Sequence, residues 1–100
     1  MAPNSEAFFQ AVKARRTIYQ LSNESTIPDS RIQELVKEAM LHTPSSFNSQ
    51  TTRLVVLLKE HHTKMWDITT EVYKQQLPED KFTLAKQRFD GFRAAYGTVR

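Results

Sequence analysis

The 100-residue chain contains no cysteine. Without thiols it can form neither disulfides nor thiolate zinc sites, and it has no cysteine nucleophile. Only two glycines are present, and this scarcity argues against an all-β protein, whose turns are rich in glycine. The glycine-rich phosphate loops of dinucleotide-binding folds and P-loop enzymes are missing too.

Long apolar stretches and long runs of like charge are also absent. The longest apolar run, residues 54–58, is far too short to cross a membrane, and the first residues lack the pattern of a secretory signal. The net charge is only +3 and the basic residues are spread along the chain, so no basic tail indicates nucleic-acid binding. We expect a cytoplasmic protein, with the nucleus as a second location, and neither a membrane nor a nucleic acid as partner.

Apolar residues do recur at the spacing of α-helices. The clearest helix covers residues 28–42, where Pro28 and Asp29 suit the first turn and Pro44 disfavours continuation. Similar patterns predict helices from residue 5 to 14 or 16, over residues 61–76, and from residue 78 to an end between residues 91 and 95. Residues 53–58 indicate a buried strand and residues 96–99 the start of another, a combination typical of α/β or α+β folds.

Arg15-Arg16-Thr17 is the first candidate binding segment. Two guanidinium groups and a hydroxyl offer donors that fit phosphate oxygens. Arginines at the end of a helix also simply complement the helix dipole, and for the tripeptide alone that structural role is the commoner one.

The second candidate segment is the polar stretch over residues 44–50. Its carboxamides present a donor and an acceptor side by side, which matches the N–H and C=O edge of a flavin-like pyrimidine ring. A plain connector between helix and strand is the alternative, and Ser45 or Ser46 could also cap a short helix.

Histidines give no metal site in this sequence. His61 and His62 are adjacent, so on a helix their imidazoles diverge by about 100°, and the i, i+4 spacing of a zinc-binding helix is absent. We therefore predict that both are solvent-exposed. No catalytic side chain and no metal ligand is assigned.

Taken together and in this order, the two candidate segments resemble the FMN-dependent nitroreductase family. More narrowly, residues 15–19, 42–50 and 52–53 resemble the branch that contains the fungal fatty-acid-repression-mutant proteins and their bacterial relatives. The resemblance covers essentially the whole chain and corresponds to the N-terminal half of a family domain. It implies an α+β fold with helices around a mixed sheet, of which residues 1–100 form a truncated, mostly helical half with one or two strands.

The resemblance also implies a cofactor site shared by two subunits of a homodimer. Arg15, Arg16 and Thr17 would hold the FMN phosphate and ribityl chain, and Lys86 or Arg88 could also reach the flavin. The same flavin would be contacted from the partner subunit by the second motif: Pro44, Ser45, Ser46, Asn48 and, less directly, Gln50.

The implied activity is that of an oxidoreductase. A hydride would pass from NAD(P)H to nitroaromatic or quinone-like small-molecule acceptors by a ping-pong mechanism. Two alternatives remain: a truncated, non-catalytic remnant that acts as a regulatory or interaction protein, and a small helical module whose arginines bind an anionic partner.

Overall fold

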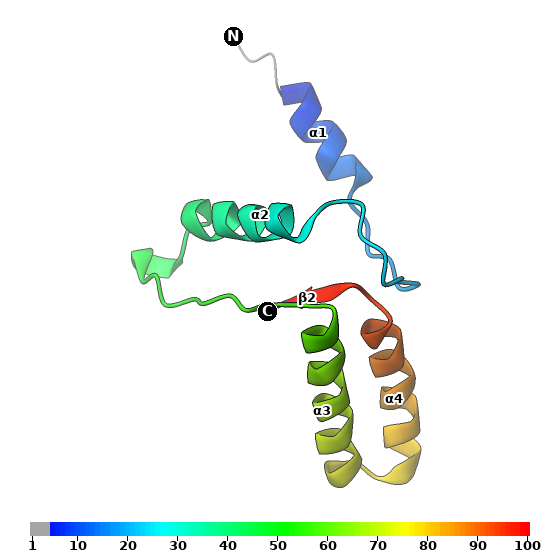
Figure 1. The fold of residues 1–100 in the computed structure, drawn as a ribbon. Coiled ribbons are helices and arrows are strands. Elements are labelled where there is room, and N and C mark those ends of the chain that lie inside the picture. The colour runs from blue at the N-terminus through cyan, green and yellow to red at the C-terminus, as the bar shows by residue number, and fades with distance from the viewer. Residues whose placement is uncertain (1–4) are drawn as a thin grey trace.

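The computed structural model describes residues 5–100 of the chain. Its elements follow one another as α1 (Ser5–Ala14), α2 (Asp29–His42), the short 3-10 helix η1 (Ser46–Asn48), β1 (Val56–Leu58), α3 (Glu60–Gln76), α4 (Glu79–Arg93) and β2 (Gly97–Val99) (Figure 1). The expected α+β architecture, mostly helical with one or two strands, is confirmed.

Proline and capping patterns explain where the helices begin and end. Pro28 and Pro78 adopt extended conformations directly before α2 and α4, and both act as acceptors for the first helical N–H groups. α2 ends at His42, as predicted, and the Thr43 N–H closes its last turn on the Ala39 carbonyl at 2.9 Å. α1 ends at Ala14, so the two arginines of the first candidate segment lie just beyond the helix.

The sheet consists of two antiparallel strands, with Val56 opposite Val99, Leu57 opposite Thr98 and Leu58 opposite Gly97. Two further hydrogen bonds between Val55 and Arg100, of 2.6 and 2.9 Å, continue the ladder. The prediction of a buried strand over residues 53–58 is wrong in both extent and burial, because β1 begins at Val56 and is only half-buried.

A hairpin of α3 and α4 carries most of the packing. Trp66 lies 5.2 Å from Phe92 and 5.8 Å from Phe89, and Tyr73 lies 5.1 Å from Phe89, all between ring centroids. Such tilted aromatic pairs are favourable beyond the area that they bury. No hydrophobic side chain within residues 5–100 is fully shielded from solvent, so the aromatic contacts between α3 and α4 form a partly exposed core.

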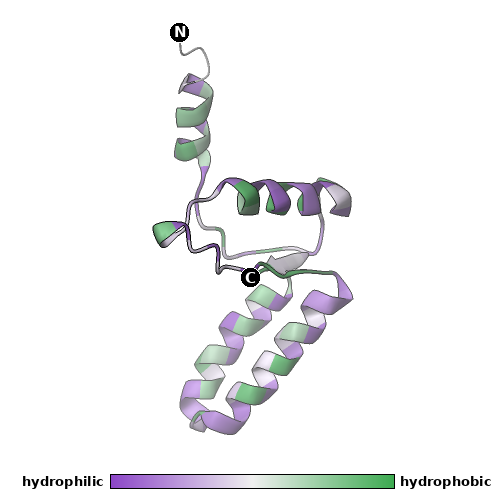
Figure 2. Ribbon diagram, turned by 90° about the vertical axis from the view of Figure 1, so that its left-hand side faces the viewer, coloured by the Kyte–Doolittle hydropathy of each residue, from purple (hydrophilic) through white to green (hydrophobic). Residues whose placement is uncertain are grey.

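The N-terminal part of the structure is far less packed. α1 stands away from the remaining elements (Figure 1), and its hydrophobic residues, which Figure 2 shows in green, stay largely exposed: Phe8, Phe9 and Val12. An isolated ten-residue helix is marginal in water. α1 therefore requires a further surface to stabilise it. Within residues 5–100, no helix combines the length and hydropathy needed to span a bilayer.

Candidate functional site

Arg15, Arg16 and Thr17 lie in an exposed irregular segment directly after α1. The Arg15 N–H still donates to the Ala11 carbonyl at 3.1 Å, which fixes the start of the segment. None of the three side chains forms a hydrogen bond or ion pair with another residue among positions 5–100. Two adjacent cations and a hydroxyl are thus available to an anion.

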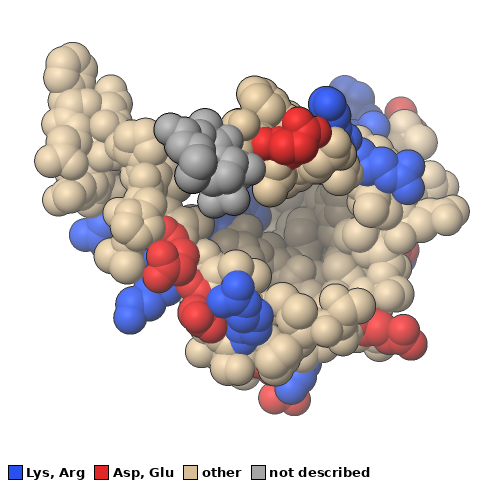
Figure 3. All heavy atoms as spheres, turned by 90° about the horizontal axis from the view of Figure 1, so that it is seen from above, with Lys and Arg blue, Asp and Glu red and all other residues tan. Residues whose placement is uncertain are grey.

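The face shown in Figure 3 carries no broad basic surface. There, lysine and arginine side chains are interspersed with aspartate and glutamate. Attraction for a phosphate on this face would come from local groups of cations rather than from a continuous positive patch.

The second segment forms a tight turn around η1. The Ser45 side-chain oxygen accepts the Gln50 N–H at 3.0 Å, and the Ser45 carbonyl accepts the Asn48 N–H at 2.9 Å. Ser45 therefore closes the turn from the far side and forms no side-chain cap on η1. The capping role considered for Ser45 is not observed.

Left-handed backbone angles give this loop its shape. Phe47, Asn48 and Gln50 all have φ between 53° and 55°, a region that asparagine tolerates but that is costly for a bulky side chain. Phe47 is completely exposed, and the carboxamides of Asn48 and Gln50 make no hydrogen bond to another described residue. Strained residues of this kind cluster at functional sites.

Arg53 stabilises the C-terminal end of this loop through its side chain. Its guanidinium donates to the carbonyls of Gln50 and Thr52, both at 2.9 Å. Sequence reasoning gave Arg53 no role beyond the family resemblance, because these contacts depend on the fold of the turn.

One chain does not bring the two segments together. Figure 1 places the end of α1 and the η1 loop on opposite sides of the molecule, with α2 between them. A ligand bound by both segments would therefore need the loop of another chain.

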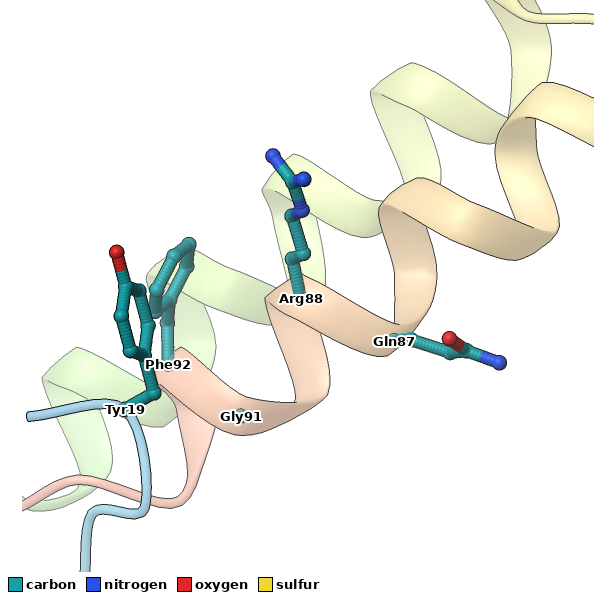
Figure 4. Close-up of a pocket in the computed structure, with 5 residues that line it drawn as sticks. All are labelled: Tyr19, Gln87, Arg88, Gly91 and Phe92. Carbon is teal, nitrogen blue, oxygen red and sulfur yellow. The ribbon is translucent and has the colours of Figure 1, made fainter.

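A cavity of about 550 Å³ is lined in part by Tyr19, which follows Thr17 by two positions in the sequence. It is lined by Tyr19, Gln87, Arg88, Gly91 and Phe92 (Figure 4). The Tyr19 ring stands beside the Phe92 ring, the Tyr19 hydroxyl and the Arg88 guanidinium point the same way, and Gln87 points away. Sequence reasoning assigned no binding role to Tyr19, Gln87, Gly91 or Phe92, because the segment after α1 and α4 are far apart in the chain.

Arg88 differs from Lys86 and Arg93 on α4, because it has no ion-pair partner within residues 5–100. Lys86 pairs with Asp90 at 2.9 Å and Arg93 with Asp67 at 2.7 Å, whereas Arg88 pairs with no carboxylate of the described residues. A guanidinium beside a cavity and without a counter-ion is a suitable partner for an anionic or electron-rich ligand.

Neither the backbone conformation nor close packing requires a glycine at position 91. It lies inside α4, has no positive φ, and a Cβ built on it would meet nothing within 4 Å. A glycine inside a helix costs roughly 1 kcal/mol relative to alanine. Its effect is to leave the helix backbone bare on one wall of the cavity, which lets a flat group approach closely.

A separate ionic cluster fixes the start of α2. The Tyr96 hydroxyl donates to the Asp29 carboxylate, and the Lys59 ammonium lies 2.9 Å from its other oxygen. The hydrogen bond from Tyr96, followed by the contact with Lys59, lowers the pKa of Asp29, and Asp29 in turn raises the pKa values of Tyr96 and Lys59. This cluster connects α2, which leads to the η1 loop, with the sheet.

The prediction that both histidines of α3 are solvent-exposed is wrong for His62. Its side chain is 1% exposed and both ring nitrogens are hydrogen-bonded, whereas His61 is exposed. Among residues 5–100 no group of three or more histidines and carboxylates is arranged to hold a metal ion.

Comparison with known proteins identifies relatives of one kind. The model of the nitroreductase family matches residues 12–96. HBN1 of Saccharomyces cerevisiae is 43% identical over 96 residues, which cover 92% of this chain and 46% of HBN1. The nitroreductase FRM2 of the same yeast is 30% identical over 102 residues, covering 99% of this chain and 49% of FRM2. The chain spans about half the length of these curated relatives.

Solved structures show the same relationship. A Saccharomyces cerevisiae nitroreductase superposes with a TM-score of 0.75 at 30% identity, over 95% of this chain and 51% of that protein. Nitroreductase CinD from Lactococcus lactis, solved with chloramphenicol, superposes with a TM-score of 0.70 at 36% identity, over 92% of this chain and 45% of CinD.

Proposed function

This chain belongs to the nitroreductase family, and we propose that residues 1–100 form the N-terminal half of a single FMN-dependent oxidoreductase domain. The family match runs through nearly the whole chain, while the chain covers about half of each relative. We expect the protein to act in the cytoplasm.

The observation that carries this proposal is the cavity beside the first candidate segment. Its volume of about 550 Å³ lies within the range typical of small-molecule sites. Tyr19 and Phe92 offer aromatic surface, Gly91 leaves the helix backbone open, and Arg88 supplies an unpaired cation. These groups suit a planar, electron-accepting ring.

Arg15, Arg16 and Thr17 suit the phosphate end of the same ligand. Their side chains are exposed and unpaired among the described residues, and they precede Tyr19 by only a few positions. A phosphate here would accept charge-assisted hydrogen bonds from both guanidinium groups. The residues present therefore fit FMN at both its anionic end and its ring.

A second copy of the chain would complete the site through its η1 loop. In one chain this loop and the end of α1 lie on opposite sides of α2 (Figure 1), yet the carboxamides of Asn48 and Gln50 have no hydrogen-bond partner within residues 5–100. In a two-fold dimer each loop would reach the other chain's flavin. The partner's contribution would come from Pro44, Ser45, Ser46, Asn48 and Gln50.

Bound FMN would supply the redox chemistry, which is hydride transfer from NAD(P)H and electron transfer to a nitroaromatic or quinone-like acceptor in separate, ping-pong half-reactions. The residues of this chain bind and orient. Carboxamides at Asn48 and Gln50 would hydrogen-bond the polar edge of the ring, and Arg88 would stabilise negative charge near it. CinD has been solved with chloramphenicol and with 4-nitrophenol, both nitroaromatics, which supports this acceptor class.

An absorbance spectrum tests the proposal directly. The purified chain is soaked in FMN, desalted and compared with Gly91→Leu, which fills the cavity, and with Thr83→Leu, an exposed position of the same helix. We expect flavin bands near one per chain in the wild type and in Thr83→Leu, and their loss in Gly91→Leu. A colourless wild-type chain would contradict flavin binding, and full retention by Gly91→Leu would contradict the cavity assignment.

The exposed apolar face of α1 favours one other function. Phe8, Phe9 and Val12 remain uncovered, as they would in a non-catalytic remnant that regulates or binds another protein. Such a protein would stay colourless after the FMN soak, so the same spectrum separates the two functions.

A further inference from the structure

His62 occupies a singular position in this structure. It lies in the first turn of α3 and is the one fully buried side chain of residues 5–100. Its Nδ1 lies 2.7 Å from the Thr98 hydroxyl of β2, and its Nε2 lies 3.1 Å from the carbonyl oxygen of Arg93 at the end of α4. One imidazole thus joins three elements.

The directions of these hydrogen bonds follow from chemistry. A carbonyl oxygen can only accept, so Nε2 must carry a proton and donate to Arg93. In the neutral ring Nδ1 then accepts, and the Thr98 hydroxyl donates to it. The same hydroxyl oxygen accepts the indole N–H of Trp66 at 3.1 Å. Every polar group in this chain of bonds has a partner while the imidazole is neutral.

Protonation of the ring would break this arrangement. The imidazolium donates from both nitrogens, so Nδ1–H would point at Thr98, whose own O–H must then turn away. The Thr98 oxygen already accepts from Trp66, and its displaced proton would have no acceptor among the contacts of the network. The ring itself is only 1% exposed, so its positive charge would also have to be held away from water, which is costly.

The surroundings of the ring within residues 5–100 offer an imidazolium no direct counter-charge. No carboxylate of residues 5–100 forms an ion pair with His62. β1 and β2 carry no charged side chain. The charged groups on the helices packed nearby are already paired or exposed: Arg93 with Asp67, Lys86 with Asp90, Lys59 with Asp29, and exposed Glu60.

We propose that His62 is a positioning residue that acts as a pH-operated latch, holding β2 and the last turn of α4 on α3 while its ring is neutral and releasing them when it is protonated. The last turn of α4 contains Gly91 and Phe92, which line the cavity. This consequence rests on the flavin site proposed above: FMN affinity falls as pH is lowered through the range where histidine takes up a proton.

Trp66 reports the latch without any ligand, because it is the single tryptophan and contacts Thr98. Its fluorescence is followed from about pH 8 to pH 5 in the full chain carrying His42→Gln and His61→Gln. Both replaced histidines are exposed, and His62 remains the only one of three. Nitrogen NMR of this protein should place the proton of the neutral ring on Nε2.

The decisive variant is His62→Gln. A glutamine can accept from Thr98 and donate to Arg93 but does not titrate in this range. We expect a fluorescence transition in the wild type and in the double variant, and a flat profile in His62→Gln with near-native fluorescence at pH 8. A transition that persists in His62→Gln, or a wild-type profile that is flat, would overturn the latch.

Two variants of Thr98 control for the possibility that a substitution only disrupts the structure. Thr98→Ser keeps the hydroxyl and should keep the transition, whereas Thr98→Val should remove it and give the pH 5 fluorescence at every pH. If His62→Gln does not fold, an unchanged transition in Thr98→Val would still overturn the proposal.

FMN titration tests the connection to the cavity separately. Relative to His62→Gln at the same pH, which cancels the titration of the FMN phosphate, the wild type should bind about tenfold more weakly at pH 5. If the wild type and His62→Gln bind FMN equally well at pH 5 and at pH 8 while the fluorescence transition remains, His62 does not control the cavity, although the latch itself still stands. Failure of every protein to bind FMN would refute the proposed function, while the Trp66 profiles would still decide on the latch.

Discussion

Residues 55–100 and residues 5–54 are held together in very different ways. The later region has a strand ladder, an aromatic seam between α3 and α4, and the buried hydrogen bonds of His62. The earlier region has α1 with its apolar face exposed, and α2 tied down at one end by Asp29.

The two candidate binding segments both fall in the poorly packed region. Arg15 and Asn48 lie on exposed segments, and their side chains have no partner within residues 5–100, whereas the cavity walls come mostly from α4. The packed region therefore supplies a rigid wall, and the open region supplies groups that require another surface to complete them. A second chain that brings its η1 loop to this wall would satisfy both needs.

The largest effect should come from breaking the packed region at Thr98. In Thr98→Val the His62 Nδ1 and the Trp66 indole N–H lose their common partner. We expect the free energy of unfolding to fall by about 2–3 kcal/mol, measured by urea denaturation with Trp66 fluorescence. Thr83→Val on the exposed face of α4 serves as control and should change it by less than about 0.5 kcal/mol. Equal losses in both would mean that the network is not a stabilising centre.

Changes in the open region should affect ligand binding and leave folding intact. Arg15→Ala or Arg16→Ala should each weaken FMN binding by roughly 1.5–3 kcal/mol, or roughly 10- to 150-fold, in a fluorescence titration. Lys13→Ala, a neighbouring cation in the last turn of α1, is the matched control. Unchanged affinity in both arginine variants would remove the phosphate assignment.

The smallest effect concerns the connection between the two regions, because the Asp29 cluster is partly solvated and such pairs contribute little. Since the pKa of Asp29 is lowered, its contribution is present at neutral pH and is lost as pH falls through the folded-state pKa. Since the pKa of Tyr96 is raised, its contribution is lost as pH rises through the folded-state pKa of that phenol. NMR shifts of α2 amides should therefore change at both extremes, and in Asp29→Asn the acid change should vanish.

Local patterns predicted the helices well, and long-range contacts account for what was missed. Pro28 and Pro44 bracket α2 because proline restricts its own backbone and that of its neighbour. His62 was assigned to the surface because helical spacing cannot reveal that Thr98, thirty-six positions away, meets its ring. Val55 was expected to be buried, because an apolar run in the sequence does not reveal that the sheet within residues 5–100 has only two strands.

The site was predictable in part. Residue chemistry alone favoured a structural role for Arg15 and Arg16, and their assignment to FMN came from the order of motifs in the family. Tyr19 and Phe92 came together only in the folded chain. Gly91 gave no clear local signal, because a glycine near the predicted end of a helix is commonly explained as a helix terminator.

Complementation between two defective chains tests the shared site most directly. One variant carries Arg15→Ala and Arg16→Ala, the other Ser46→Ala and Asn48→Ala, and the two are unfolded together, refolded and titrated with FMN beside the wild type. If each site combines the arginines of one chain with the loop of the other, neither variant alone binds well, while random mixing restores about one site in four. A mixture that binds no more FMN than the separate variants would contradict a site built across two chains.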